Sequence, residues 1–311
     1  MHMPSPTPAA EPPATCGIAA HALVAARLPE IAALRDQPGP AGAPALPSRF
    51  LRHCDEHTVV GMHAILRALA ARGTDDVSRH AVVAASCQVG RLAAAKTLAN
   101  LATGGGVSVS PHIVPQCSLH SVAGAVSVGL GMRGPHLGVG GGSDALAEGL
   151  FAAATIMQAS AAAGDPPCVW LVATEWEDEP ALDAAGIPVG DPVCRGLALA
   201  IEPDAPDHAT DDGGSRADTA RRLVAAARRA AASGTSSLSL TLRFPEPSRL
   251  RVVAPAAARL AEFARALDMC REGTALVSWA LECPWGAEIR VSRRPAAAGR
   301  ATLAARLREA A

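Results

Sequence analysis

Residues 109–135 read VSPHIVPQCSLHSVAGAVSVGLGMRGP, the most informative stretch of the chain. A helix can begin at Pro115, because proline fits the first helical turn, where backbone N–H groups have no partner within the helix. Residues 119–130 are rich in small side chains, and residues 136–139 predict a short strand. An Ala- and Leu-rich helix over 143–161 follows. The stretch therefore predicts closely packed helices around a short strand.

The segments on either side alternate between short apolar runs and apolar residues at helical spacing. Upstream, the pattern predicts a strand over 16–20, a helix over 56–72, a strand over 81–86 and a helix over 90–101. Downstream, it predicts strands over 168–173, 197–201, 237–243, 275–281 and 287–292, and helices over 217–232 and 256–270. This alternation predicts an α/β protein in which helices cover mostly parallel sheets.

The stretch 109–135 resembles the middle of a β-ketoacyl synthase. Eight residues fall in register with that family without a gap: Ser110, Pro111, Pro115, Ala123, Gly124, Gly131, Gly134 and Pro135. Residues 49–69 are similar to the family's first long helix, 84–90 to its strand and glycine turn, and 196–202 to the strand that ends its N-terminal half. The resemblance implies a thiolase-like (ketosynthase) α/β fold with layered αβαβα architecture and a shortened C-terminal half.

A single ketosynthase-like domain is expected over 16–294. It would comprise an N-terminal half over 16–202, an acidic loop over 203–216 and a short C-terminal half over 217–294. The proline-rich residues 1–15 are expected to form a flexible leader, and residues 295–311 a tail helix.

The departures from the family concern its catalytic residues. Counted from Gly134 and Pro135, the family's nucleophilic cysteine falls on Ser143, after three consecutive glycines. The family's two C-terminal histidine motifs are missing, because His208 is the single histidine after Cys194 and lies in the acidic loop. Residues 283–288, CPWGAE, look like a degraded form of the glycine-rich turn before the last strand.

Ser143 itself has two interpretations. A serine hydroxyl is a weak nucleophile without an adjacent base, and serine at the start of a helix is a favoured cap. His112, His120 or His136 could in principle supply a base, although the family's fold places none of them for that role. Capping is the preferred interpretation, and no catalytic residue is expected in this chain.

Chains that keep this fold without the cysteine are chain-length factors, the non-catalytic subunits of ketosynthase heterodimers in type II polyketide synthesis. The resemblance is greatest to those of polyene and aryl polyene pathways. It implies a catalytic ketosynthase as partner, an acyl carrier protein that carries the growing chain, and no cofactor. The chain would then be a subunit of a β-ketoacyl synthase (transferase) complex without being catalytic by itself. The alternatives are a self-contained Ser-dependent acyltransferase or weak β-ketoacyl synthase, and a scaffold that only stabilises the ketosynthase.

The resemblance also indicates where the partner and the acyl tunnel would lie. Dimer contacts are expected through the strand 136–139 and the helix near Pro115, where Gly138 and other small residues permit close approach. The tunnel or interface residues would be His112, Ile113, Gln116, Cys117, His120 and Gly138. The same residues could instead only pack the interface.

Composition excludes several other classes of protein. The 311 residues are 49% apolar and 18% charged, with 28 basic and 29 acidic side chains, four Phe, four Trp and no Tyr. This balance indicates a globular protein and gives no sign of nucleic-acid binding. No membrane span and no signal peptide are expected, so a cytoplasmic location is predicted. The eight cysteines are scattered, without the Cys-x-x-Cys spacing of a metal or redox site.

Four further patterns carry less weight. Residues 129–134 match the dinucleotide pattern G-x-G-x-x-G but precede a strand rather than a helix, and 138–143 lack the lysine of a phosphate-binding loop. The acidic residues within 175–179 are expected to form a solvated loop rather than a metal site. His53 and His57 stand at a spacing that suits metal ligands, yet no metal is predicted there.

Overall fold

The computed structural model describes residues 14–73, 76–162, 168–184, 186–203, 238–243, 260–272, 278–283 and 285–293. Four of the predicted features therefore lie wholly or almost wholly outside the described residues. They are the leader up to residue 13, the loop with His208 from residue 204, the helix over 217–232 and the tail over 295–311.

The chain alternates between strands and helices, as predicted. The helices are α1 (Leu28–Leu34), α2 (Glu56–Arg72), α3 (Arg91–Gly104), α4 (Ile113–Gln116), α5 (Ser121–Leu130), α6 (Ala145–Ala162) and α8 (Leu260–Glu272), with a 3-10 turn η1 (Gly106–Ser108). The strands are β1 (Ala14–Arg27), β2 (Ala81–Cys87), β3 (His136–Gly141), β4 (Val169–Trp176), β5 (Ala181–Leu182), β6 (Pro188–Val189), β7 (Val193–Pro203), β8 (Leu238–Arg243), β9 (Ser278–Glu282) and β10 (Glu288–Arg293).

Eight of the strands form one sheet in the order β3-β2-β4-β7-β1-β8-β10-β9. Strand β2 pairs in parallel with β3 and with β4. The other ladders between described strands of this sheet are antiparallel. The expectation of mostly parallel sheets is therefore wrong: β7 and the C-terminal strands run against their neighbours.

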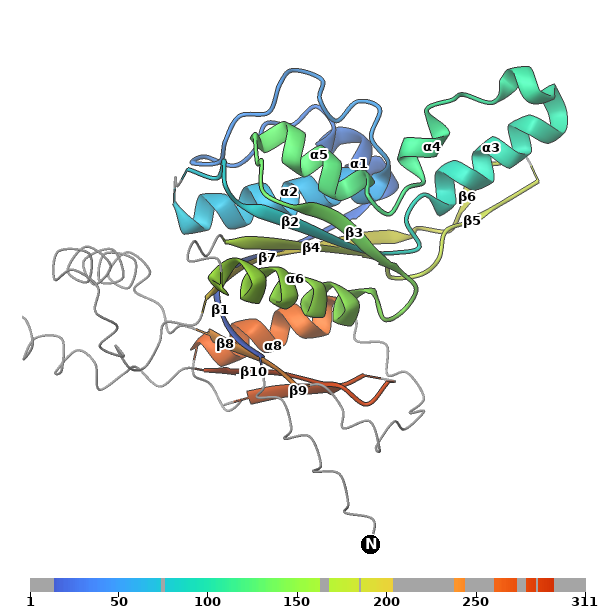
Figure 1. Ribbon diagram of the computed structural model, residues 1–311. Helices are drawn as coiled ribbons and strands as arrows, with labels where there is room; N and C mark the ends of the chain where they lie inside the picture. The colour runs from blue at the N-terminus through green and yellow to red at the C-terminus, as the bar shows by residue number, and fades with distance from the viewer. Residues whose placement is uncertain are drawn as a thin grey trace, which may run out of the picture.

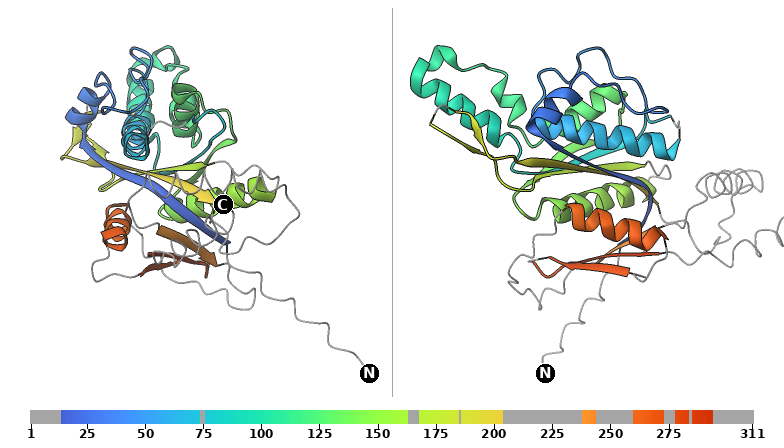
Figure 2. Two further views of the ribbon diagram at one scale, coloured as in Figure 1. Left: turned by 90° about the vertical axis from the view of Figure 1, so that its left-hand side faces the viewer. Right: turned by 180° about the vertical axis from the view of Figure 1, so that it is seen from behind.

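The elements lie in layers (Figure 1). Helices α1, α2 and α5 cover one face of the part of the sheet formed by β1, β2, β3, β4 and β7. Helices α6 and α8 lie on its opposite face, and β8, β10 and β9 lie beyond them, as the side view in Figure 2 also shows. The described residues thus form four layers in the order α, β, α, β. The α/β class and the layering are confirmed, while a fifth, outer helical layer is not found among the described residues.

Alternating side chains of each strand supply the two cores between these layers. Along β4, Val169 and Leu171 point to the core under α6 and α8, whereas Trp170 and Val172 point to the core under α2 and α5. Successive residues of a strand face opposite sides of a sheet, so a strand covered on both faces must be apolar throughout. The unbroken apolar run over 168–173 follows from this.

A buried chain of polar side chains connects helix α2 to the sheet. The Nδ1 atom of His57 lies 2.9 Å from the hydroxyl of Thr174 in β4, and that hydroxyl donates to the hydroxyl of Ser86 in β2 at 2.8 Å. The ring of Trp176 meets the imidazole edge to face, with centroids 5.7 Å apart. Burial lowers the pKa of His57 to about 4, although the nearby charge of Glu56 acts in the opposite direction. The folded protein therefore keeps this imidazole neutral.

The lowered pKa of His57 predicts a loss of stability in mild acid. In the unfolded chain a histidine titrates near its ordinary pKa of about 6.5, so between that pH and about 4 the unfolded state binds more protons than the folded state. The stabilisation is complete above pH 6.5 and is lost as the pH falls. We expect His57 to account for about 2 kcal/mol of the decrease in unfolding free energy from pH 7.5 to pH 5. Urea unfolding of wild type and His57→Gln at both pH values measures this contribution.

The comparison uses the difference between two pH values, so a general destabilisation by His57→Gln cancels. Burial also lowers the pKa of His21 and His63, so the variant should retain part of the pH dependence. An equally steep pH dependence in the variant would contradict the assignment to His57.

Candidate functional site

The carboxyl ends of the parallel strands β2, β3 and β4 meet at one edge of the sheet, which is where open α/β sheets generally bind ligands. Ser143 lies two residues beyond β3 at this edge, and its side chain is exposed. The approach to it is a glycine turn: Gly140 and Gly141 have φ values of 92° and 109°, a region that side chains with a Cβ rarely adopt. A Cβ at Gly140 would also lie 2.6 Å from the Cβ of Ala145. The strand–turn–helix geometry is therefore fixed by glycines, whatever residue occupies position 143.

Ser143 is not the cap of the following helix. Helix α6 begins at Ala145, so the position before its first residue belongs to Asp144, whose carbonyl accepts the N–H of Glu148 at 3.0 Å. The prediction that Ser143 caps this helix is corrected accordingly. The helix pattern placed the start two residues early, because a serine and an aspartate follow one another there and both are favoured caps.

Among the described residues, no hydrogen bond joins the hydroxyl of Ser143 to a histidine. His136 begins β3, so five residue steps of extended chain, roughly 16 Å, separate it from the end of the strand at Gly141. The imidazole of His120 is bonded to that of His136 instead. This arrangement gives an exposed alcohol without general-base assistance.

The acidic residues at this edge are engaged in holding the structure together. A Glu175 oxygen accepts the N–H of Leu260, the first residue of α8, at 2.9 Å. Glu177 pairs with Arg195 at 2.5 Å, and Glu179 pairs with Arg91 at 2.8 Å. Within the described part of the chain, no group of three or more His, Cys, Asp or Glu side chains could hold a metal ion. The prediction of a simple solvated loop misses the capping and ion-pair roles of these three residues.

The predicted tunnel segment lies at the base of an arm formed by α3, η1 and α4, which projects from the body beside β5 and β6 (Figure 1). Ile113 and Gln116 line a cleft of about 340 Å³ between this arm and the loop before α2. His112 is exposed and is not among the residues that line the cleft. Of the six predicted residues, Ile113 and Gln116 are the two that line this cleft.

The remaining predicted residues have separate environments. The thiol of Cys117 donates to the carbonyl of Gly90 at 3.4 Å, so this side chain faces the turn before α3. Gly138 lies against the turn that precedes α5: a Cβ at position 138 would be 2.0 Å from the carbonyl oxygen of Leu119. Gly138 was predicted to permit close approach of a partner chain. In the structure it permits close approach of the turn at Leu119, within the same chain.

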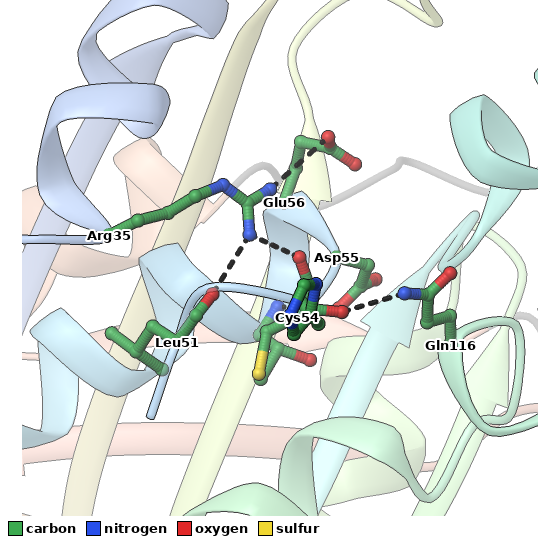
Figure 3. A network of polar contacts seen from close by, with 8 residues as sticks. Arg35, Leu51, Cys54, Asp55, Glu56 and Gln116 are labelled. Atoms are coloured by element: carbon green, nitrogen blue, oxygen red, sulfur yellow. Dashed lines mark hydrogen bonds and ion pairs between the residues drawn. The ribbon is translucent and has the colours of Figure 1, made fainter. Parts of the chain in front are cut away.

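Most of the residues that line the cleft have polar side chains, and Figure 3 shows the polar contacts that join several of them. The Arg35 guanidinium donates to the carbonyls of Leu51, at 3.0 Å, and of Cys54, and lies 3.6 Å from a Glu56 oxygen. The side-chain amide of Gln116 donates to the carbonyl of His53 at 2.6 Å and so fastens the arm to the body. Arg52, Asp55 and Lys96 also line the cleft.

Asp55 is a buried residue of the cleft lining. One of its carboxylate oxygens caps α2 by accepting the N–H of Thr58 at 3.0 Å, while the other has no hydrogen-bond partner. Burial raises the pKa of this carboxyl group. Neither Asp55 nor Arg35 was singled out from the sequence. An aspartate before the helix that starts at Glu56 was the available signal for the first, and no local pattern marks the second.

His53 is exposed whereas His57 is fully buried and bonded to Thr174, so the two share no metal site despite their spacing. None of the helices that the structure describes combines the length and apolar character required to cross a bilayer.

The fold and this edge define a layered α/β protein with a glycine turn that presents a serine. No protein-family model matches the sequence, and no curated protein matches it significantly. Among solved structures, the chain is similar to one in the complex of the ketosynthase ApeO with its chain length factor ApeC from Xenorhabdus doucetiae, at 17% identity over 90% of this chain and 99% of that one, with a TM-score of 0.48.

Two further solved structures are similar over nearly their whole length. They are the ishigamide ketosynthase/chain length factor, with 16% identity, 90% and 99% coverage and a TM-score of 0.44, and a β-ketoacyl synthase from Burkholderia phymatum, with 11%, 91% and 98%, and 0.45. At these identities and TM-scores the similarity assigns no activity or partner to this chain.

The close contact of Gly138 predicts a strong effect of a single methyl group. Because Gly138→Ala would drive a Cβ into backbone atoms of Leu119, β3 or the turn must shift, at a cost of about 1–3 kcal/mol in unfolding free energy. The matched control is Gly142→Ala, where an added Cβ meets nothing within 4 Å, and this change should be neutral or slightly stabilising. Denaturant unfolding of both variants checks this. Equal stability of the two variants would contradict the contact.

Proposed function

We propose that this chain is a non-catalytic chain-length factor, which pairs with a catalytic ketosynthase in type II polyketide biosynthesis of the polyene type. The observation that carries the proposal is the setting of Ser143: it stands on a glycine turn between a strand and a helix, with no histidine bonded to it among the described residues. By the resemblance, this is the position of the family's nucleophile. A hydroxyl without a base forms an acyl-enzyme poorly, so the condensing chemistry belongs to a partner subunit. The growing chain would be delivered on an acyl carrier protein.

Strand β3 is a suitable surface for the partner. It ends the eight-stranded sheet, and its outer edge pairs with no other strand among the described residues. An edge strand exposes unpaired backbone donors and acceptors, which favour addition of a strand from another chain. The half-buried residues of β3 are therefore expected to become fully covered in the heterodimer.

The arm offers a second contact. Several of its apolar side chains are exposed: Leu98 at 65%, Val107 at 100% and Val114 at 73%. Apolar side chains grouped in this way on one projecting segment are typical of a protein–protein contact. Obligate interfaces commonly bury more than about 2,000 Å² in total, and the β3 edge together with the arm would contribute to such an area.

The polar cleft bears on the choice between a chain-length factor and a scaffold. If Ile113 reaches the partner's acyl tunnel, it would do so as one apolar residue among charged neighbours, and most of the tunnel wall would come from the ketosynthase. The charged lining of the cleft is the observation that favours the scaffold alternative. A Ser-dependent acyltransferase has no comparable support, because Ser143 lacks a base.

Pairing is the first consequence to test. Co-expressed with a ketosynthase encoded beside it, the chain should co-purify as a heterodimer and should show no condensing activity alone. Leu98→Glu and Val114→Glu should weaken the complex, because each would bury a charge in an apolar contact. Met269→Glu, at an exposed position on α8, is the matched control and should leave the complex intact. Size-exclusion chromatography with light scattering measures this. A monodisperse monomer that ignores the ketosynthase would overturn the proposal.

Product length is the second test, in an intact complex. Ile113→Ala should open the tunnel and lengthen the product, whereas Ile113→Phe should shorten it, at a stability cost of about 1–3 kcal/mol from overpacking. Ser143→Ala is the control: the hydroxyl is exposed and unassisted, so turnover should be nearly unchanged. Mass spectrometry of the products decides between the alternatives. Unchanged length in both Ile113 variants would leave the scaffold role, and a loss of turnover beyond about a hundredfold in Ser143→Ala would indicate catalysis by this chain.

A further inference from the structure

Two histidines from different elements lie side by side on the surface. His120 immediately precedes α5, and His136 is the first residue of β3. Their ring centroids are 4.9 Å apart with the planes tilted by 32°, and Nε2 of His120 lies 3.1 Å from Nδ1 of His136. Both residues are exposed, so a solute can reach the two nitrogens.

The backbone holds this pair together. A Cβ at Gly138 would lie 2.7 Å from the backbone nitrogen of His120, so β3 runs directly against the residue that carries one of the rings. The carbonyl of His120 accepts the N–H of Gly124 at 2.9 Å, and the His120 ring lies over Gly124, close to where a Cβ would be. This backbone contact keeps the two residues adjacent before any ligand arrives, so only the rings must reorient on binding.

Neutral imidazole nitrogens are good ligands for divalent transition metals. When one ion binds two imidazole nitrogens with bonds of about 2.0–2.1 Å, the two nitrogens lie roughly 3 Å apart or slightly more. The observed separation of 3.1 Å is therefore close to what a shared ion requires.

We propose that His120 and His136 form a two-histidine site for a divalent transition metal such as Cu²⁺. A small rotation of the exposed rings turns both lone pairs from each other toward one ion, and water fills the other coordination positions. Without metal, one ring N–H donates to the unprotonated nitrogen of the other ring. The proposal rests on the geometry of this chain and does not depend on the proposed function.

Titration calorimetry of the full chain with Cu²⁺ tests the site. We expect the wild type to bind one equivalent more than the double variant His120→Asn/His136→Gln. Each single variant should weaken this binding about tenfold or more, since loss of even a second-shell partner commonly costs a site that much. His53→Gln removes another exposed histidine and is the matched control, which should retain the equivalent. Cu²⁺ that binds elsewhere in the chain is common to the wild type and all variants, so it cancels in the comparison.

Electron paramagnetic resonance of the Cu²⁺-loaded chain supplies an independent readout. The wild type should show a tetragonal spectrum with coupling to two imidazole nitrogens at this site, and each single variant should show one fewer. Circular dichroism melts establish that the variants are folded, and the single variants serve if the double variant is not. Equal stoichiometry, affinity and nitrogen coupling in the wild type and the folded variants would overturn the proposal.

Discussion

Strand β1 is hydrogen-bonded to β7 from Cys16 to Arg27 and to β8 from Ala14 to Ile18. This double pairing joins the N-terminal part of the sheet to the C-terminal strands, and the sheet bends there so that α6 and α8 become enclosed between its two parts (Figure 2). A contact between β1 and α8 supports the bend, because the imidazole of His21 lies 2.8 Å from an Asp268 oxygen and accepts from Arg271 at 2.9 Å. The layers on which the site depends follow from this one strand.

The turn at Leu119 and His120, which packs against Gly138, determines the surface features at the edge of the sheet. It fixes β3 at the edge of the sheet, so one end of the strand carries the glycine turn and Ser143 while the other carries His136 beside His120. The exposed edge of β3, the glycine turn with Ser143 and the histidine pair therefore all depend on one close backbone contact. A side chain at position 138 would disturb all three, whereas the residue at 143 disturbs none of them.

Local signals explain how much the sequence could predict. Helix α2 was predicted with its observed bounds, because Gly73 ends a strongly periodic segment, whereas β1 was predicted as 16–20 and is 14 residues long, because alanines and glycine hide a strand that only its two partners stabilise. The tunnel residues were placed at helical spacing, but α4 ends at Gln116, so Cys117 and His120 turn elsewhere. The Arg35 contacts and the histidine pair join residues at least 16 positions apart, and only tertiary packing brings them together.

The same packing explains why catalysis and fold can separate in such a protein. A nucleophile at position 143 would stand on an exposed turn whose conformation depends on Gly140 and Gly141, and the helix after it starts from Asp144. The residue at position 143 is exposed and makes no core contact, and surface substitutions without such contacts typically change stability by less than about 0.5 kcal/mol. The layers, the edge strand and the arm therefore do not depend on which residue stands at position 143.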